Sequence, residues 1–310
     1  MNPVASADAI AAAFIDACLL DVTALKPGNV GLHAGGHGMG PLDFVRSAEA
    51  AAPAIVASAA SVGERIHRAV AATHQAVGAN TNVGIVLLAA PVVHAAMQRP
   101  LPSASHLLAD RLNAVLDSLT VADAERAFAA IRLARPGGLG SAVQHDVHAP
   151  ARTNLRDAMR EAADRDMIAR QYAGGYADVI ETGLGRLAEA RAQGRDWRWT
   201  MTEVYLAFLS RYPDSHIARK FGAEQATPVR DEAAEYARAV AQGPDPAALS
   251  EPLLKWDGEL KARGLNPGTS ADLAVASLFL QFLCAPHADD YPQRGARRDA
   301  GEEVGIFPTG

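Results

Sequence analysis

Residues 84–97 read Gly-Ile-Val-Leu-Leu-Ala-Ala-Pro-Val-Val-His-Ala-Ala-Met, the longest apolar stretch of the chain. The stretch is apolar on every helical face, which is typical of a helix inside a protein core. Its 14 residues, which include His94, fall short of the roughly 20 that cross a bilayer. We therefore expect a buried helix here and no association with a membrane.

Apolar residues recur at helical spacing along the rest of the chain, and no alternating strand pattern competes. Hydrophobic residues make up 49% of the sequence and aromatic residues only 5%, which favours close helix packing over strands. The expected fold class is all-α, a single-domain multi-helix bundle over residues 1–285 with an extended or mobile tail at 286–310. The predicted helices cover approximately residues 6–24, 41–59, 63–77, 82–97, 104–117, 121–133, 153–191, 200–211, 228–242, 246–263 and 269–285.

Charge and cysteine content narrow the class of protein further. The formal net charge of −6 gives no long-range attraction to polyanions, so nucleic-acid binding is not expected. Cys18 and Cys284 lie in apolar helical patterns without metal-ligand spacing, which predicts reduced thiols. The first twenty residues lack a basic start and contain Asp8 and Asp16, unlike a secretory signal. A cytoplasmic location fits these features.

The predicted helix over 153–191 carries one carboxylate on its apolar stripe. Leu155, Met159 and Ala162 mark that stripe, and Asp166 falls on it. A carboxylate that faces a core needs an ion pair, a hydrogen bond or a cation. Asp166 is therefore a candidate metal ligand or catalytic group, and an ion pair with Arg170, one turn later, is the structural alternative.

Asn80, Thr81 and Asn82 come directly before the apolar helix of residues 84–97. Their side chains occupy its cap and first turn, where unpaired N–H groups and the helix dipole favour an anion such as phosphate. Plain capping is the structural alternative. Three capping-type residues in a row exceed what one helix end requires.

A second helix start follows the turn at Asn266. Thr269 or Ser270 can cap the helix after this turn, and Asp272 suits either a cap or an oxygen ligand of Mg²⁺. Spacing alone does not separate these two roles.

His216, Arg219 and Lys220 follow a cap residue, Asp214, at positions i, i+3 and i+4. This spacing places three potential cations on one helix face, which suits a polyphosphate. A solvated basic face is the alternative.

Two glycine-containing turns carry the remaining candidates. Lys26 and Asn29 bracket a Pro-Gly turn, where backbone can approach a ligand closely. Asp146 and His148 follow the loop Pro136-Gly137-Gly138-Leu139-Gly140. A lone glycine-rich loop is weak evidence of phosphate binding.

Taken in order, these motifs resemble those of the triphosphoribosyl-dephospho-CoA synthases over about residues 8–285. The segments that carry the resemblance are Lys26-Pro27-Gly28-Asn29, Gly78-Ala79-Asn80-Thr81-Asn82-Val83-Gly84, Asp164-Arg165-Asp166-Met167-Ile168-Ala169-Arg170-Gln171-Tyr172, His216-Ile217-Ala218-Arg219-Lys220 and Leu265-Asn266-Pro267-Gly268-Thr269-Ser270-Ala271-Asp272-Leu273. The first turn continues as Asn29-Val30-Gly31, where citrate- and malonate-linked members have an acidic residue. The chain is thus more similar to a divergent branch found with methanopterin-type one-carbon chemistry.

The resemblance implies an enzyme that moves a triphosphoribosyl group from ATP to 3'-dephospho-CoA and releases adenine, with a central polar nucleotide cleft, Mg²⁺ and a possible homodimer. The residue roles carried over on this basis are catalytic for Asp166, Asp146 and His148, metal-binding for Asp166 and Asp272, and nucleotide-binding for Lys26, Asn29, Asn80, Thr81, Asn82, Arg170, His216, Arg219, Lys220, Asn266 and Ser270.

Three other functions remain open at this stage. The same nucleotide chemistry can serve a different acceptor in a methanopterin-linked pathway. A nucleotide-binding protein without turnover is the second alternative. A helical hydrolase with a dinuclear metal site ranks lower, because its paired carboxylate motifs are missing.

Overall fold

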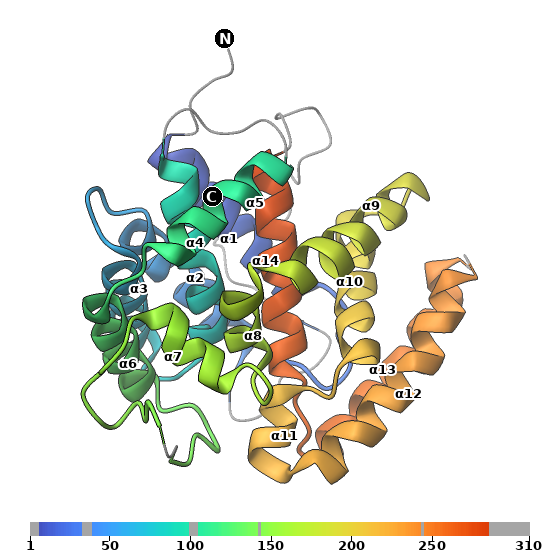
Figure 1. The fold of residues 1–310 in the computed structure, drawn as a ribbon. Helices are drawn as coiled ribbons and strands as arrows, with labels where there is room; N and C mark the ends of the chain where they lie inside the picture. The colour runs from blue at the N-terminus through green and yellow to red at the C-terminus, as the bar shows by residue number, and fades with distance from the viewer. Residues whose placement is uncertain (1–5, 33–38, 99–104, 142–143, 243–244, 285–310) are drawn as a thin grey trace. The chain divides into compact units, whose positions relative to one another are not determined.

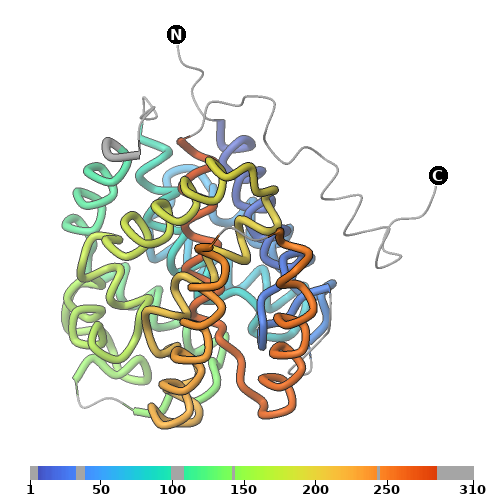
Figure 2. The backbone as a smooth tube through the Cα atoms, turned by 90° about the vertical axis from the view of Figure 1, so that its right-hand side faces the viewer, coloured from blue at the N-terminus to red at the C-terminus, as the bar shows by residue number. Residues whose placement is uncertain are grey.

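The computed structural model describes residues 6–32, 39–98, 105–141, 144–242 and 245–284. These residues form helices and no β-strand, as Figures 1 and 2 show, which confirms the all-α prediction. The predicted tail, residues 286–310, lies outside the described residues. The helices are α1 (Ala7–Thr23), α2 (Pro41–Ile55), α3 (Val62–Val77), α4 (Val83–Met97), α5 (Ser105–Asp117), α6 (Val121–Ala134), α7 (Leu155–Ala162), α8 (Met167–Gly174), the π-helix η1 (Val179–Leu184), α9 (Gly185–Ala192), α10 (Trp197–Arg211), α11 (Ser215–Phe221), α12 (Ala223–Ala241), α13 (Pro246–Ala262) and α14 (Gly268–Cys284).

The chain divides into two compact units, each assembled from separate stretches of sequence. In the described part of the chain, the first unit comprises residues 6–15, 46–178 and 279–284, and the second comprises residues 16–32, 39–45 and 179–278. A single domain over residues 1–285 stays a prediction. Each unit is described by itself below.

Helix α4 forms the core of the first unit, as its apolar sequence predicts. All of its residues from Gly84 to Val93 are buried, and it packs against α3, α5, α6 and α8. The Tyr172 and Tyr176 hydroxyls donate to the carbonyl oxygens of Leu87 and Leu88 at 2.6 and 2.7 Å. Within the described ranges, no helix combines the length and apolar character that spanning a membrane requires.

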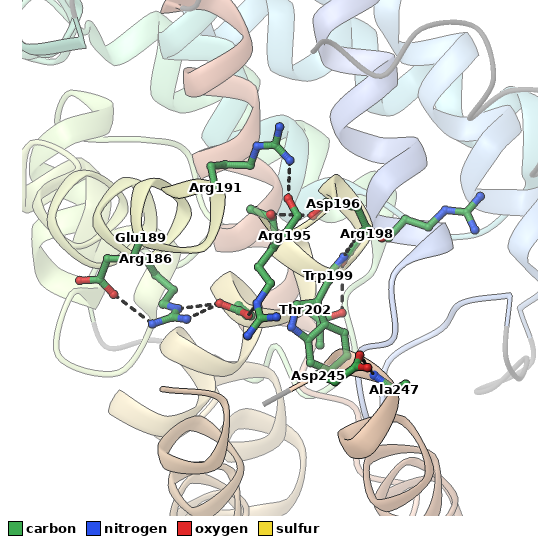
Figure 3. A network of polar contacts seen from close by, with 12 residues as sticks. Arg186, Glu189, Arg191, Arg195, Asp196, Arg198, Trp199, Thr202, Asp245 and Ala247 are labelled. Carbon is green, nitrogen blue, oxygen red and sulfur yellow. Dashed lines mark hydrogen bonds and ion pairs between the residues drawn. The ribbon is translucent and has the colours of Figure 1, made fainter. Parts of the chain in front are cut away.

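Helix α10 organises the second unit, where it packs against α9, η1 and α12. Arg186 and Arg195 both form ion pairs with the fully buried Glu203 side chain, the latter at 3.2 Å. Figure 3 shows these two arginines within a polar network that ties α9 to α10. In the same unit, the Tyr236 ring of α12 stacks on the Trp256 ring of α13 with 4.7 Å between centroids.

The prediction of one helix over residues 153–191 is wrong. This stretch folds as α7, α8 and the continuous pair η1 and α9, with a turn before α8 and another after it. Asn154 and Asp166 begin α7 and α8 as N-caps, and Gly175 ends α8 in the left-handed conformation at φ 67°. Because capping oxygens and a left-handed residue satisfy the backbone groups at helix ends, these residues interrupt the helix despite continuous apolar spacing.

Candidate functional site

Lys26 forms a buried ion pair at the turn after α1 in the second unit. Its side chain is 1% exposed, and its Nζ lies 3.0 Å from Asp21 Oδ1. Nζ also donates a hydrogen bond to Asn29 Oδ1, and Asn29 Nδ2 donates to Asn266 Oδ1 at 2.8 Å. The turn at Lys26 and the turn at Asn266, far apart in sequence, therefore meet through one chain of polar contacts.

This turn is held in place by its backbone. The Gly28 N–H donates to Asp257 Oδ1 at 2.8 Å, and the Tyr205 hydroxyl donates to the Pro27 carbonyl oxygen at 2.5 Å. Gly28 has φ +81°, and a Cβ at this position would lie 2.8 Å from the Pro267 ring. Only glycine accommodates both constraints without strain.

The buried Asp214 carboxylate joins α11 to the start of α14. Oδ1 accepts from the N–H groups of His216 and Ile217, and Oδ2 accepts from both the N–H and the hydroxyl of Ser270. The prediction that Ser270 caps the second helix is therefore corrected. Helix α14 already begins at Gly268, and Ser270 donates to a carboxylate from another helix.

Asp272 lies among charged groups of the same unit. Burial and the nearby Asp21 and Asp214 carboxylates raise the pKa of Asp272 well above its usual range, and the cations of Lys26 and Arg219 offset only part of this rise. Part of the residue's surface is still exposed. A carboxyl group in this setting favours its protonated form unless a further cation is present.

Only part of the basic face predicted on α11 lies near Asp272 and the start of α14. Arg219 is half-buried and close enough to Asp272 to lower its pKa. His216 is also half-buried, and its Nδ1 lies 2.7 Å from where a Cβ on Gly268 would stand. Lys220 is exposed, with its Nζ 5.2 Å from the centre of the Phe221 ring.

In the first unit, Asn80, Thr81 and Asn82 form the start of α4. Asn80 Oδ1 accepts from the Val83 N–H at 3.3 Å, and the Thr81 hydroxyl donates to Ser47 Oγ at 2.5 Å. Asn82 occupies the N-cap position, but its side chain makes no cap bond. Its buried Nδ2 has no hydrogen-bond partner among the described residues. Asn80 therefore caps α4, and the Asn82 amide nitrogen makes no hydrogen bond within the described residues.

Asp166 lies in a different local setting from the one predicted. Its Oδ1 accepts from the N–H groups of Ile168 and Ala169 at 2.9 and 3.1 Å, so it caps α8 rather than lying on a core-facing stripe. Arg170 donates through Nε to Asp178 Oδ2 at 2.8 Å. Asp178 also accepts a hydrogen bond from Gln171.

Asp146 and His148 form a local turn in the first unit. Asp146 Oδ1 accepts from the His148 N–H at 2.8 Å. The His148 residue is exposed.

The structure thus gathers predicted residues from three turns and helix starts of the second unit, and it places Lys220 and the predicted residues of the first unit in local settings. The gathered residues are Lys26, Asn29, His216, Arg219, Asn266, Ser270 and Asp272. Asp21, Asp214 and Asp257 were missed as parts of the site. Asp21 gave the same signal as Asp166, a carboxylate within an apolar helical pattern. In the described part of the chain, no group of three His, Cys, Asp or Glu residues is placed to hold a metal ion.

Comparisons with known proteins identify the fold and the family of this chain. The described chain has the fold of a crystal structure from Archaeoglobus fulgidus, provisionally named triphosphoribosyl-dephospho-CoA synthase, with a TM-score of 0.61 and 24% identity over 78% of this chain and 97% of the other. The family model for ATP:dephospho-CoA triphosphoribosyl transferase matches residues 7–290. The chain therefore belongs to the ATP:dephospho-CoA triphosphoribosyl transferase family.

Two curated relatives match over shorter stretches. A Citrobacter koseri protein, provisionally named 2-(5''-triphosphoribosyl)-3'-dephosphocoenzyme-A synthase, is 35% identical over 38% of either chain. The synthase of that name from Pectobacterium atrosepticum is 31% identical over 36% of this chain and 34% of its own. The matched stretch thus spans little more than a third of each relative.

Proposed function

We propose that this chain transfers a triphosphoribosyl group from ATP to 3'-dephospho-CoA and releases adenine. The observation that carries the proposal is the family match over residues 7–290, combined with the Lys26, Asn29, Asn266 and Asp272 cluster in one unit. A ribose 2'-hydroxyl oxygen of the acceptor bonds to C1' of ATP as the C1'–N9 bond breaks. The hydroxyl proton goes to a base, and the departing adenine takes up a proton.

Magnesium fits the setting of Asp272. Two neighbouring carboxylates raise the pKa of this group, and a divalent cation would relieve that repulsion. Mg²⁺ commonly binds one or two carboxylates together with substrate phosphates, so a dedicated three-residue cage is not required. Asp272 is the residue proposed to hold Mg²⁺, which would supply charge neutralisation for the triphosphate.

The triphosphate is proposed to contact basic side chains and a helix start. In the second unit, Lys26, His216, Arg219 and Lys220 supply positive charge, and Asn29, Asn266 and Ser270 supply polar contacts. Anion-binding roles for Arg170, Asn80, Thr81 and Asn82, which lie in the first unit, are a separate proposal. It is supported there by the buried Asn82 amide nitrogen, which has no partner among the described residues, at the positive end of α4.

Proton transfer is assigned to the first unit. Asp166 or Asp146 would accept the hydroxyl proton, and His148 would protonate adenine as it leaves. Protonation of the departing adenine assists C1'–N9 cleavage through a transition state with oxocarbenium character, and removal of the hydroxyl proton assists formation of the new C1'–O bond. Asp166 is kept as an alternative Mg²⁺ ligand, because its carboxylate chemistry suits either role.

The proposal is tested by incubating the purified protein with ATP, Mg²⁺ and 3'-dephospho-CoA and measuring free adenine by chromatography. Adenine release that depends on this acceptor supports the proposal. Release only with a pterin-type acceptor favours the alternative pathway. A rise in melting temperature with ATP but no adenine with any acceptor favours a binding protein.

The proposal also covers the oligomeric state and the cellular location of the chain. We propose a homodimer in the cytoplasm. Light scattering after size exclusion tests the dimer: twice the chain mass supports it, and a single chain mass contradicts it.

A further inference from the structure

A pocket of about 480 Å³ lies in the first unit, and none of the residues assigned above lines it. It is lined by residues 58–61, Arg65, His94, Met97 and Gln98. The loop at 58–61 leads into α3, whose N-cap is Ser61. The pocket therefore faces the positive end of a 16-residue helix.

Arg65 brings a buried positive charge to this pocket. The residue is 3% exposed, and its Nη1 donates to the carbonyl oxygens of Ile55 and Ala57 at 2.7 and 2.9 Å. Its Nε is buried and has no hydrogen-bond partner among the described residues. A buried guanidinium whose donors are not all used is suited to an anion.

A second nitrogen in the pocket lining also lacks a partner. His94 Nδ1 is buried without a hydrogen bond within the described ranges. Burial and the Arg65 charge lower the pKa of His94 despite a contact with the Ala60 carbonyl and the more distant Asp123. The Ala60 carbonyl accepts a hydrogen bond from the other ring nitrogen, Nε2, so Nδ1 of the neutral imidazole is an acceptor and is available to a ligand hydroxyl.

Two carboxylates at the start of α3, those of Glu64 and Asp123, are already hydrogen-bonded to backbone N–H groups. Glu64 accepts from the Ser61 N–H at 3.1 Å and pairs with Arg68 at 3.4 Å. Asp123 accepts from the N–H groups of Gly63 and Thr120 at 2.8 and 2.9 Å. The pocket lining itself contains no acidic residue, so nothing in it competes with an incoming anion.

We propose that this pocket binds a phosphate group, which accepts a hydrogen bond from Arg65 Nε at the start of α3. Arg65 supplies the charge, and the pocket volume leaves room for a group attached to the phosphate. Free inorganic phosphate and a phosphate carried by the nucleotide acceptor share this chemistry. The free-phosphate arm is independent of the proposed transferase activity.

The test measures binding of inorganic phosphate and, separately, of 3'-dephospho-CoA by calorimetry at matched ionic strength. Arg65 also donates to two backbone carbonyls, so its replacement would disturb the fold as well as the pocket. The test variant is therefore Ser58→Glu in the exposed loop. The introduced carboxylate competes for Arg65 and repels an anion. Arg68→Gln, with a side chain 51% exposed on the same helix, is the control.

We expect saturable binding by the unchanged protein, about tenfold or more weaker binding by Ser58→Glu, and little change in Arg68→Gln. If Ser58→Glu binds inorganic phosphate more weakly, free phosphate is identified as the ligand. If it binds only 3'-dephospho-CoA more weakly, the ligand is a phosphate carried by the acceptor. Both results support the pocket. The proposal is overturned if Ser58→Glu binds both ligands as the unchanged protein does, or if the unchanged protein binds neither.

Discussion

Asp214 Oδ2 accepts both the N–H and the hydroxyl of Ser270, each at 2.8 Å. Its other oxygen caps α11, so a single buried carboxylate fixes the starts of two helices. The same carboxylate raises the pKa of Asp272. The position of the predicted nucleotide-binding residues on α11 and α14 therefore depends on Asp214.

Asp214→Ala should be strongly destabilising. It removes all four acceptor contacts and leaves buried donors without partners, which should lower the free energy of unfolding by about 3 kcal/mol. Asp245→Ala is the control, because Asp245 is an exposed cap that, among the described residues, accepts the Ala247 N–H alone, and its loss should cost about 1 kcal/mol. Denaturant unfolding measures both. Equal losses would contradict a special role for Asp214.

Lys26→Met should lower the free energy of unfolding by more than the removal of a surface charge does. The Asp21 carboxylate would remain buried without its partner, which should lower the free energy of unfolding by about 3–5 kcal/mol. Lys255→Met is the matched control, because that side chain is 80% exposed and lies 4.0 Å from Glu259, so its cost should be below about 1 kcal/mol. A loss in Lys26→Met as small as the control's would rule out a stabilising ion pair.

Asp272 should make stability depend on pH. Because its pKa is raised in the folded protein, the native state holds more protons than the unfolded state between the unfolded pKa near 4 and the higher folded value. Stability should therefore fall as pH rises through this window, by up to about 1.4 kcal/mol per pH unit. Asp272→Asn should flatten the decline and stabilise the protein at neutral pH.

Unfolding curves between pH 5 and pH 8, in buffer with a chelator, measure this effect. Asp231→Asn is the control, because its side chain is 63% exposed. Parallel curves for Asp272→Asn and the unchanged protein would show that Asp272 does not carry the pH dependence.

Two substitutions at Asp166 distinguish its role as a helix cap from a catalytic role. Asn also caps helices, so Asp166→Asn should change the free energy of unfolding by less than about 0.5 kcal/mol, while Asp166→Ala should lose about 1 kcal/mol. If the carboxylate accepts the hydroxyl proton, kcat for adenine release should fall at least about 100-fold in both variants. Full kcat in Asp166→Asn would leave Asp166 only as a helix cap.

Much of the helical architecture could be predicted from periodicity. The apolar stretch before Met97 is a buried helix, and the predicted ends of most helices lie within a few residues of those observed. The exception, residues 153–191, failed because apolar spacing continues across the turns that Asp166 and Gly175 create. Local capping therefore decided the structure there, and the apolar pattern alone did not reveal it.

The site was less predictable because its contacts join distant parts of the sequence. Asp214 could be identified as the cap of its own helix, but its bond to Ser270 spans 56 positions. The link from Asn29 to Asn266 spans 237 positions. The motif resemblance identified these residues but not the contacts between them. The carboxylates near Asp272 could be identified only from the folded structure.

The most direct test of the account is the stoichiometry of the reaction with ATP, Mg²⁺ and 3'-dephospho-CoA. Mass spectrometry of the acceptor and chromatography of the released base should show one triphosphoribosyl group added to the acceptor for each adenine formed, with both products strongly reduced in Asp272→Asn. Adenine without modified acceptor, or ADP in place of adenine, would contradict triphosphoribosyl transfer by this chain.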